Sequence, residues 1–175
     1  MGRAITKKDV TIWIVDADTN PSALTDGDRV QGLITNLDQT GGGVNIEHRD
    51  VFPGKVKTIT ARDDFEVSLD FISNGVREEE LLKYFMDSVE VDTDDIYRSN
   101  LSPKSYAIFV EIGLGADTLT YAYNDATGVT FEPSHSADDV REGTLSFTVG
   151  SETPEGQANV MAALLPAENL PNWDA

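Results

Sequence analysis

The chain has 175 residues, a formal net charge of −18 at neutral pH and no cysteine. This length suits a single domain spanning residues 1–175. The absence of cysteine excludes disulfides, thiolate catalysis and cysteine-bound metals, and the strong acidity argues against a surface that grips nucleic acid. No apolar run reaches the roughly 20 residues of a membrane span, and the N-terminus lacks a signal-like apolar segment, so we expect no membrane partner.

The acidity has three interpretations: a solvated surface, a surface that repels phosphate, or adaptation to a cation-rich habitat. Asp outnumbers Glu and Lys is scarce, which is typical of salt-loving organisms. A halophilic host is therefore one hypothesis for the origin of this chain.

The first predicted strand is Thr11–Val15, in which Trp13 supplies a large apolar side chain. Residues 16–28 follow as a loop that begins like a calcium-binding loop. Pro21 and Gly27 replace the turn glycine and the bidentate glutamate of an EF-hand, which excludes that motif. A looser calcium site at Asp16 and Asp18 is the alternative to an ordinary solvated turn.

A second strand is predicted at Arg29–Thr35, followed by a long loop from Asp38 to Gly54. Glycine-rich sequence without periodicity predicts mobility, yet the loop also holds apolar residues that a solvated loop does not need. Loops of this length are uncommon unless they are functional or disordered. We therefore expect this loop to become ordered between subunits through Gly42, Val44, Ile46, Val51 and Phe52.

The segment after this loop changes from strand to helix periodicity. Residues 65–72 alternate between apolar and polar side chains and are expected to form a hairpin with the strand at residues 55–61. After residues 73–75 the apolar residues recur at helical spacing as far as Val89, which predicts one short helix. Packing of this helix on a sheet predicts a shared core of Leu69, Phe71, Leu81, Phe85, Ile108, Val110 and Phe147.

The rest of the chain reads as more strands joined by turns. An acidic loop at residues 90–103 precedes strands at 104–114, 118–123, 129–132 and 144–149, with turn signals at residues 124–125 and 127–128. Residues 151–175 contain a further short strand or helix and read as a C-terminal arm that docks elsewhere. The expected fold is mainly β, an antiparallel β-sandwich or split barrel flanked by one short α-helix.

No catalytic, cofactor-binding or metal-binding residues are predicted. His48 and His135 lie in irregular polar stretches without a second ligand at useful spacing. Ser134, His135 and Asp138 are too close in sequence to favour a catalytic triad, and no nucleophile elbow occurs. We therefore expect a protein that is not an enzyme.

The order of these parts resembles the major tail tube proteins of long-tailed, non-contractile viruses of bacteria or archaea. The resemblance rests on the segments FEVSLDFISNGVREEELLKYFM, YAIFVEIGLG, TLTYAYNDATGVTFEPS and DDVREGTLSFTVG. It covers most of the chain. It implies a virion protein, made in the host cytoplasm, that self-associates into stacked hexameric rings and forms the tail tube for genome delivery. It also implies contacts with other tail proteins.

DNA would pass through such a tube without specific binding, and an acidic lumen would serve this because like charges prevent adhesion. Glu66, Asp70 and Glu111 alternate with apolar residues on their strands and are the proposed channel-lining residues. The alternative from another class is a secreted or surface β-sandwich binding module that depends on calcium through residues 92–95. A tail terminator or a capsid decoration protein is a third alternative.

Overall fold

The computed structural model describes residues 10–29, 33–51, 54–73, 86–91, 94–99, 104–114, 117–135, 141–153 and 156–175. These residues form antiparallel strands and three short 3-10 turns, η2 (Pro21–Ala23), η3 (Asp26–Asp28) and η4 (Ala167–Asn169). The strands are β1 (Val10–Asp16), β2 (Leu33–Gly41), β3 (Val44–Val51), β4 (Gly54–Arg62), β5 (Phe65–Ser73), β6 (Met86–Val91), β7 (Asp94–Ser99), β8 (Tyr106–Leu114), β9 (Asp117–His135), β10 (Arg141–Val149) and β11 (Val160–Ala163). The expected mainly β, antiparallel fold is confirmed.

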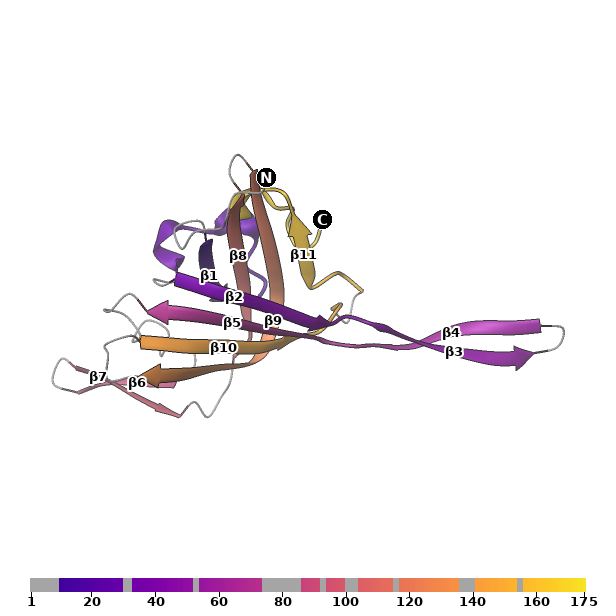
Figure 1. The fold of residues 1–175 in the computed structure, drawn as a ribbon, viewed down its shortest axis with the longest axis horizontal. Coiled ribbons are helices and arrows are strands. Elements are labelled where there is room, and N and C mark those ends of the chain that lie inside the picture. Colours follow the sequence, from indigo (N-terminus) through magenta and orange to yellow (C-terminus); the bar gives the residue numbers. More distant parts are fainter. Residues whose placement is uncertain are drawn as a thin grey trace.

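One seven-stranded sheet runs in the order β1-β8-β9-β10-β5-β2, and β11 pairs with β9 beside it. The sheet curls into a half-barrel, so that the strands at its two ends cross steeply (Figure 1). We call β1, β8, β11 and residues 117–126 of β9 the first half-sheet. The second half-sheet comprises β2, β5, β10 and residues 127–135 of β9.

The main core lies between the two half-sheets. The predicted alternation of residues 104–114 is confirmed, because Tyr106, Ile108 and Val110 are buried in this core. The rings of Tyr123 and Phe147 meet edge to face across it, with centroids 5.4 Å apart. Leu69, Ile108, Val110 and Phe147 share the core as expected, whereas Leu81 and Phe85 lie outside the described residues. For Phe71 only the backbone position in β5 is described.

Strand β9 joins the half-sheets, and here the expected turn between strands at residues 118–123 and 129–132 is wrong. Residues 117–135 form one continuous strand that pairs with β8 and β11 through its first part and with β10 through its second. The turn signals mark two bulges. Each ladder shifts by one residue on β9, and Asp125 (φ 52°) and Gly128 (φ 58°) adopt left-handed backbone conformations there. The strand bends without reversing because the flanking ladders hold its direction.

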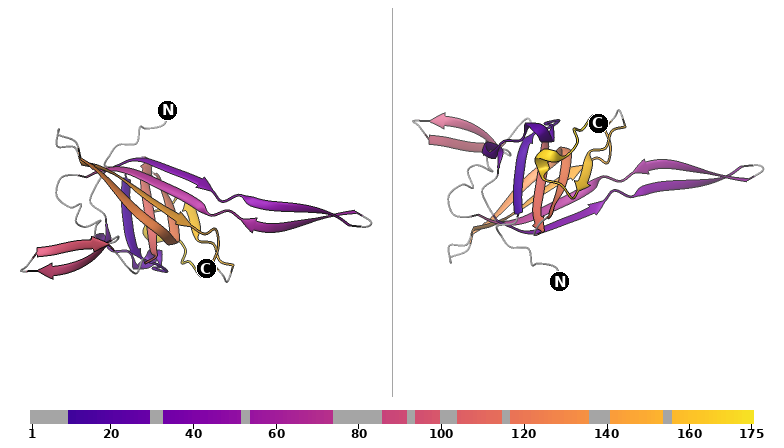
Figure 2. Two further views of the ribbon diagram at one scale, coloured as in Figure 1. Left: turned by 90° about the horizontal axis from the view of Figure 1, so that it is seen from below. Right: turned by 90° about the horizontal axis from the view of Figure 1, so that it is seen from above.

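The expected long loop at residues 38–54 is also wrong in its secondary structure. Residues 38–41 belong to β2, residues 44–51 form β3, and β3 pairs with β4. The predicted hairpin between residues 55–61 and 65–72 does not form either, because β5 pairs with β2 and β10. Residues 33–51 and 54–73 instead make one long two-stranded ribbon, whose β3–β4 part we call the arm. The arm leaves the half-barrel and extends far beyond it (Figures 1 and 2).

Two more predictions fall on the segment after β5. The predicted helix lies mostly in residues 74–85, outside the described residues, and its continuation to Val89 is wrong because residues 86–91 form β6. The predicted acidic loop at residues 90–103 is wrong for residues 94–99, which form β7 and pair with β6 as a separate hairpin.

The second predicted strand, at residues 29–35, is shifted along the chain. Arg29 forms only an isolated bridge with Trp13, and β2 begins at Leu33.

The C-terminal residues dock on their own chain. Strand β11 extends the first half-sheet, and η4 with the residues after it covers the outer face of that half-sheet. Trp173 packs on Phe109 with ring centroids 5.8 Å apart, and its Nε1–H donates to the Thr19 carbonyl at 2.9 Å. The sequence predicted a docked arm, and the surface that receives it is a second core cluster around Trp13, Ala107, Phe109 and Ala122.

Candidate functional site

The outer face of the second half-sheet is polar from edge to edge. In each strand the residues between the core positions carry hydroxyl, amide or carboxylate groups, and the register aligns them in three rows. Reading across β2, β5, β10 and β9, the rows are Thr40–Glu66–Thr148–Thr127, Asp38–Ser68–Ser146–Thr130 and Asn36–Asp70–Thr144–Glu132. We call these twelve residues the polar face. None of them is Lys or Arg.

The polar face is built by simple strand alternation. Val67 and Leu69 of β5 are buried, whereas Glu66 is exposed and Asp70 is half-buried. The Thr144 hydroxyl donates to the Asp70 carboxylate at 2.7 Å, which ties adjacent strands together across the face. A shallow depression of about 330 Å³ opens beside Glu66, lined by Asp38, Thr40, Ser146 and Thr148 among others. This surface therefore has no cationic group that would neutralise a phosphate.

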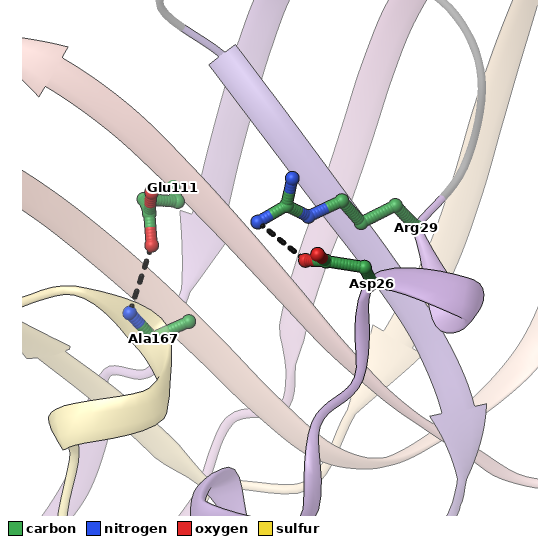
Figure 3. A network of polar contacts seen from close by, with 4 residues as sticks. All are labelled: Asp26, Arg29, Glu111 and Ala167. Atoms are coloured by element: carbon green, nitrogen blue, oxygen red, sulfur yellow. Dashed lines mark hydrogen bonds and ion pairs between the residues drawn. The ribbon is translucent and has the colours of Figure 1, made fainter.

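Glu111, predicted together with Glu66 and Asp70, lies on the opposite side of the fold. It alternates with Val110 of the main core and therefore faces the outside of the first half-sheet. Its Oε2 accepts a hydrogen bond from the backbone N–H of Ala167 at 2.9 Å, which anchors η4 (Figure 3). Arg29 lies close by, paired with Asp26 at 2.9 Å and placed 5.3 Å above the Trp13 ring. Glu111 thus has a structural role in holding the C-terminal segment.

Sequence reasoning missed two further acids of the polar face. Val129 and Phe131 pack against the main core, so Glu132, which follows Phe131, faces outward. This alternation on the predicted strand 129–132 could have revealed Glu132. Asp38 fell within the supposed loop, and only the pairing of β2 with β5 places it beside Ser68. The structure brings Glu66 and Asp70 together with these two residues and separates all four from Glu111.

The arm carries the predicted subunit-contact residues. Val44, Ile46 and Val51 lie in β3, Gly42 lies at the root of the arm, and Phe52 lies outside the described residues. Within the described part of the chain, β3 and β4 pair only with each other. An isolated two-stranded hairpin is marginally stable in water. The role of these residues in subunit contacts remains a prediction.

Glycines fix the root of the arm. Gly41 and Gly42 have φ angles of 92° and 73°, and a side chain at either position would meet neighbouring atoms. At Gly41 the obstacle is the Asp64 carbonyl, and at Gly42 it is the Phe65 ring. On the other side of the root, Arg62 pairs with Glu152 at 3.2 Å. The arm therefore leaves the half-barrel in a direction that close packing defines.

The other candidate sites have structural explanations. Asp18 receives a hydrogen bond from the Asn124 side chain at 2.8 Å, and its backbone N–H donates to Asn124 Oδ1 at the same distance. Asp18 thus holds the first bulge of β9, and no cluster of metal-ligand side chains occurs among the described residues. His48 and His135 lie in β3 and β9 rather than in loops, and Asp138 lies outside the described residues. The described part of the chain contains no helix suited to span a membrane.

Several solved structures are similar to this chain, including the following two. A chain of the sheath–tube complex of an extracellular contractile injection system (PVC), in its extended state, has 12% identity and a TM-score of 0.50, with 93% of each chain covered. The tube-terminating cap of the anti-feeding prophage has 9% identity and a TM-score of 0.49, with 94% of each chain covered. No protein-family model and no curated protein matches the chain. This chain therefore shares its fold with a chain of the sheath–tube complex of a contractile injection system.

Proposed function

We propose that this protein is a tail tube subunit that self-associates into rings, six subunits to a ring, and that the rings stack into a channel for genome delivery in a virus-like particle. The observation that carries this proposal is the combination of a tail-tube-like fold with an arm whose strands pair only with each other within the described part of the chain. An isolated hairpin gains stability only by packing against something else. In a homo-oligomer every subunit supplies the same contact, which makes self-association the direct solution.

The polar face is the surface best suited to line the channel. A DNA duplex slides past a wall only if the wall offers no cations to its phosphates, and this face carries four carboxylates, no Lys and no Arg. The opposite outer face is covered by the C-terminal segment and held by Glu111. We therefore assign Asp38, Glu66, Asp70 and Glu132 to the lumen in place of the earlier set that included Glu111.

The family that the sequence resembles belongs to non-contractile viruses, whereas the similar structures come from a contractile injection system and from the cap of the anti-feeding prophage. All of these particles contain a tube. The proposed role is that of a tube subunit, with other tail proteins as partners at the tube ends. The proposed role requires no catalysis and no cofactor.

Electron microscopy and light scattering of the purified protein test the proposal. We expect rings or tubes at high protein concentration. A variant in which residues 42–64 are replaced by Asn-Gly joins the paired residues Gly41 and Phe65 through a two-residue turn and removes the arm. This variant should fold and lose ring stacking. A wild-type protein that stays monomeric at all concentrations contradicts the proposal and favours the binding-module alternative.

A further inference from the structure

The arm has the opposite charge to the rest of the chain. Residues 44–62 contain four of the thirteen Lys and Arg residues against two acids, a net charge of +2, whereas the other 156 residues carry a net charge of −20. The basic residues are Arg49, Lys55, Lys57 and Arg62. The segment that projects furthest from the half-barrel is thus a basic segment of an acidic protein (Figure 1).

The half-barrel from which the arm projects exposes more acids than bases. Among the described side chains outside the arm, the exposed acids outnumber the exposed bases, which are Arg29 and Lys104. Arg29 is already paired with Asp26, and Arg62 at the base of the arm is paired with Glu152. Identical bodies with this charge repel one another, and the repulsion opposes assembly at low ionic strength. A basic segment that reaches across to a neighbour reverses the sign of the interaction at the contact.

We propose that the arm is an electrostatic docking element whose partner is the acidic surface of a second copy of this chain. The proposal rests on the tube function and specifies how one ring recognises the next. Opposite charges steer encounter and fix partner choice, and the interaction weakens as salt shortens the screening length to about 3 Å at 1 M. The apolar residues of β3 then contribute contact area after docking.

Nucleic acid is the competing partner for a basic segment. The rest of the chain disfavours it, because phosphate binding needs clustered cations and the net charge of −20 repels the duplex. The acidic surface of another copy is present at the same concentration as the arm and is available in every ring. The observations therefore favour a second copy.

The test compares the wild type with the double variant Lys55→Glu/Lys57→Glu. The control is Lys104→Glu/Arg98→Glu, which changes the net charge equally outside the arm. Ring mass is measured by light scattering, and stack length by electron microscopy, from 50 mM to 1 M NaCl. We expect all three proteins to form rings, wild-type and control stacks to shorten as salt rises, and the arm variant to lose at least tenfold in stack length at low salt.

Zero-length carbodiimide coupling gives a second readout that does not need rings. In a mixture of isotopically light and heavy protein, coupling should join Lys55 or Lys57 to an Asp or Glu of the other isotope. If rings form and the stack length changes neither with salt nor in the variant Lys55→Glu/Lys57→Glu, the docking proposal is overturned while the tube function stays intact. If no rings form, the tube function fails, and the presence or absence of these couplings decides the docking proposal. Arm-dependent retention of a labelled DNA duplex would overturn it in favour of nucleic acid.

Discussion

At the scale of single residues, Tyr123 shows how burial and pH are linked in this fold. Its ring is fully buried in the main core, and its hydroxyl donates to Gln39 Oε1 at 2.7 Å. Burial raises the pKa of Tyr123, and the neighbouring Tyr121 adds to the effect. Burial also raises the pKa of Tyr106, with a further contribution from the Asp16 carboxylate. Both phenols therefore stay neutral in the folded protein at pH values where the unfolded chain ionises.

This linkage predicts a loss of stability in alkali. A tyrosine whose folded pKa exceeds the unfolded value of about 10 contributes stability below pH 10 and loses it as the pH rises above that value. Tyr123→Phe should lower stability slightly at pH 7 and make the decline between pH 9 and 11 less steep. Urea denaturation at several pH values measures both effects. An unchanged slope would show that Tyr123 ionises equally in both states.

Trp173 holds the C-terminal segment on the first half-sheet. Its ring packs at a tilt against Phe109, its indole donates to the Thr19 carbonyl, and its backbone N–H donates to Asn20 Oδ1 at 3.3 Å. Trp173→Ala should cost about 3 kcal/mol of unfolding free energy, as large aromatic truncations do. Leu164→Ala is the control, because Leu164 is 66% exposed and its truncation should change stability by less than about 0.5 kcal/mol. Equal effects in denaturant melts would show that the segment is not part of the cooperative fold.

At the scale of elements, the sequence predicted individual strands better than their partners. Residues 104–114 were predicted correctly because alternation on one face and a glycine at the end are local signals. Residues 38–54 were misread because three consecutive glycines suggest a loop, whereas pairing of β2 with β5 and of β3 with β4 holds the same residues extended. Asp38 was therefore not among the predicted channel-lining residues. Glu111 was included because strand alternation does not reveal which outer face another segment covers.

The root of the arm offers a controlled test of backbone and packing effects. Gly42 and Gly156 have similar φ angles, 73° and 84°, but a side chain at Gly42 would meet the Phe65 ring and one at Gly156 would meet nothing within 4 Å. Gly156→Ala should cost about 1 kcal/mol from backbone strain alone. Gly42→Ala should cost about 1 to 3 kcal/mol more from overpacking and should speed hydrogen exchange in β3 and β4. Identical costs would mean that Phe65 moves freely and does not set the direction of the arm.

At the scale of the whole molecule, the outer faces of the two half-sheets differ in what covers them. The first half-sheet is closed by its own C-terminal segment, whereas the second presents hydroxyls and carboxylates to solvent. A symmetric ring would repeat each of these carboxylates once per subunit, so the negative charge of the polar face would add up around the ring. The fold class and the two acids Glu66 and Asp70 could be predicted from alternation. The separation of the faces depends on long-range packing that sequence patterns do not encode.

Together with the proposed tube function, this arrangement predicts how assembled tubes respond to charge changes on the polar face. Glu66→Lys/Asp70→Lys should leave the subunit folded and make tubes retain labelled duplex DNA at low salt, with retention lost near 1 M NaCl. Asp117→Lys/Glu168→Lys changes the charge equally on exposed residues away from the polar face and should leave the tubes indifferent to DNA inside the channel. Nuclease protection of the bound duplex separates the interior from the exterior. Protection by the control variant instead would place the polar face outside the channel.

The paired bulges of β9 also constrain how the chain can change its length. Tyr123, Ala126 and Val129 all pack in or against the main core although each lies three positions after the last, because one extra residue is inserted at each bulge. Deleting Asp125 or Gly128 alone would shift the downstream half of the strand by one position, exposing Val129 and Phe131 and burying Thr130 and Glu132. Deleting both would restore the phase but straighten the strand that curls the sheet. Insertions and deletions here can be tolerated only as matched pairs, and even a matched pair would remodel the curvature on which the shape of the subunit depends.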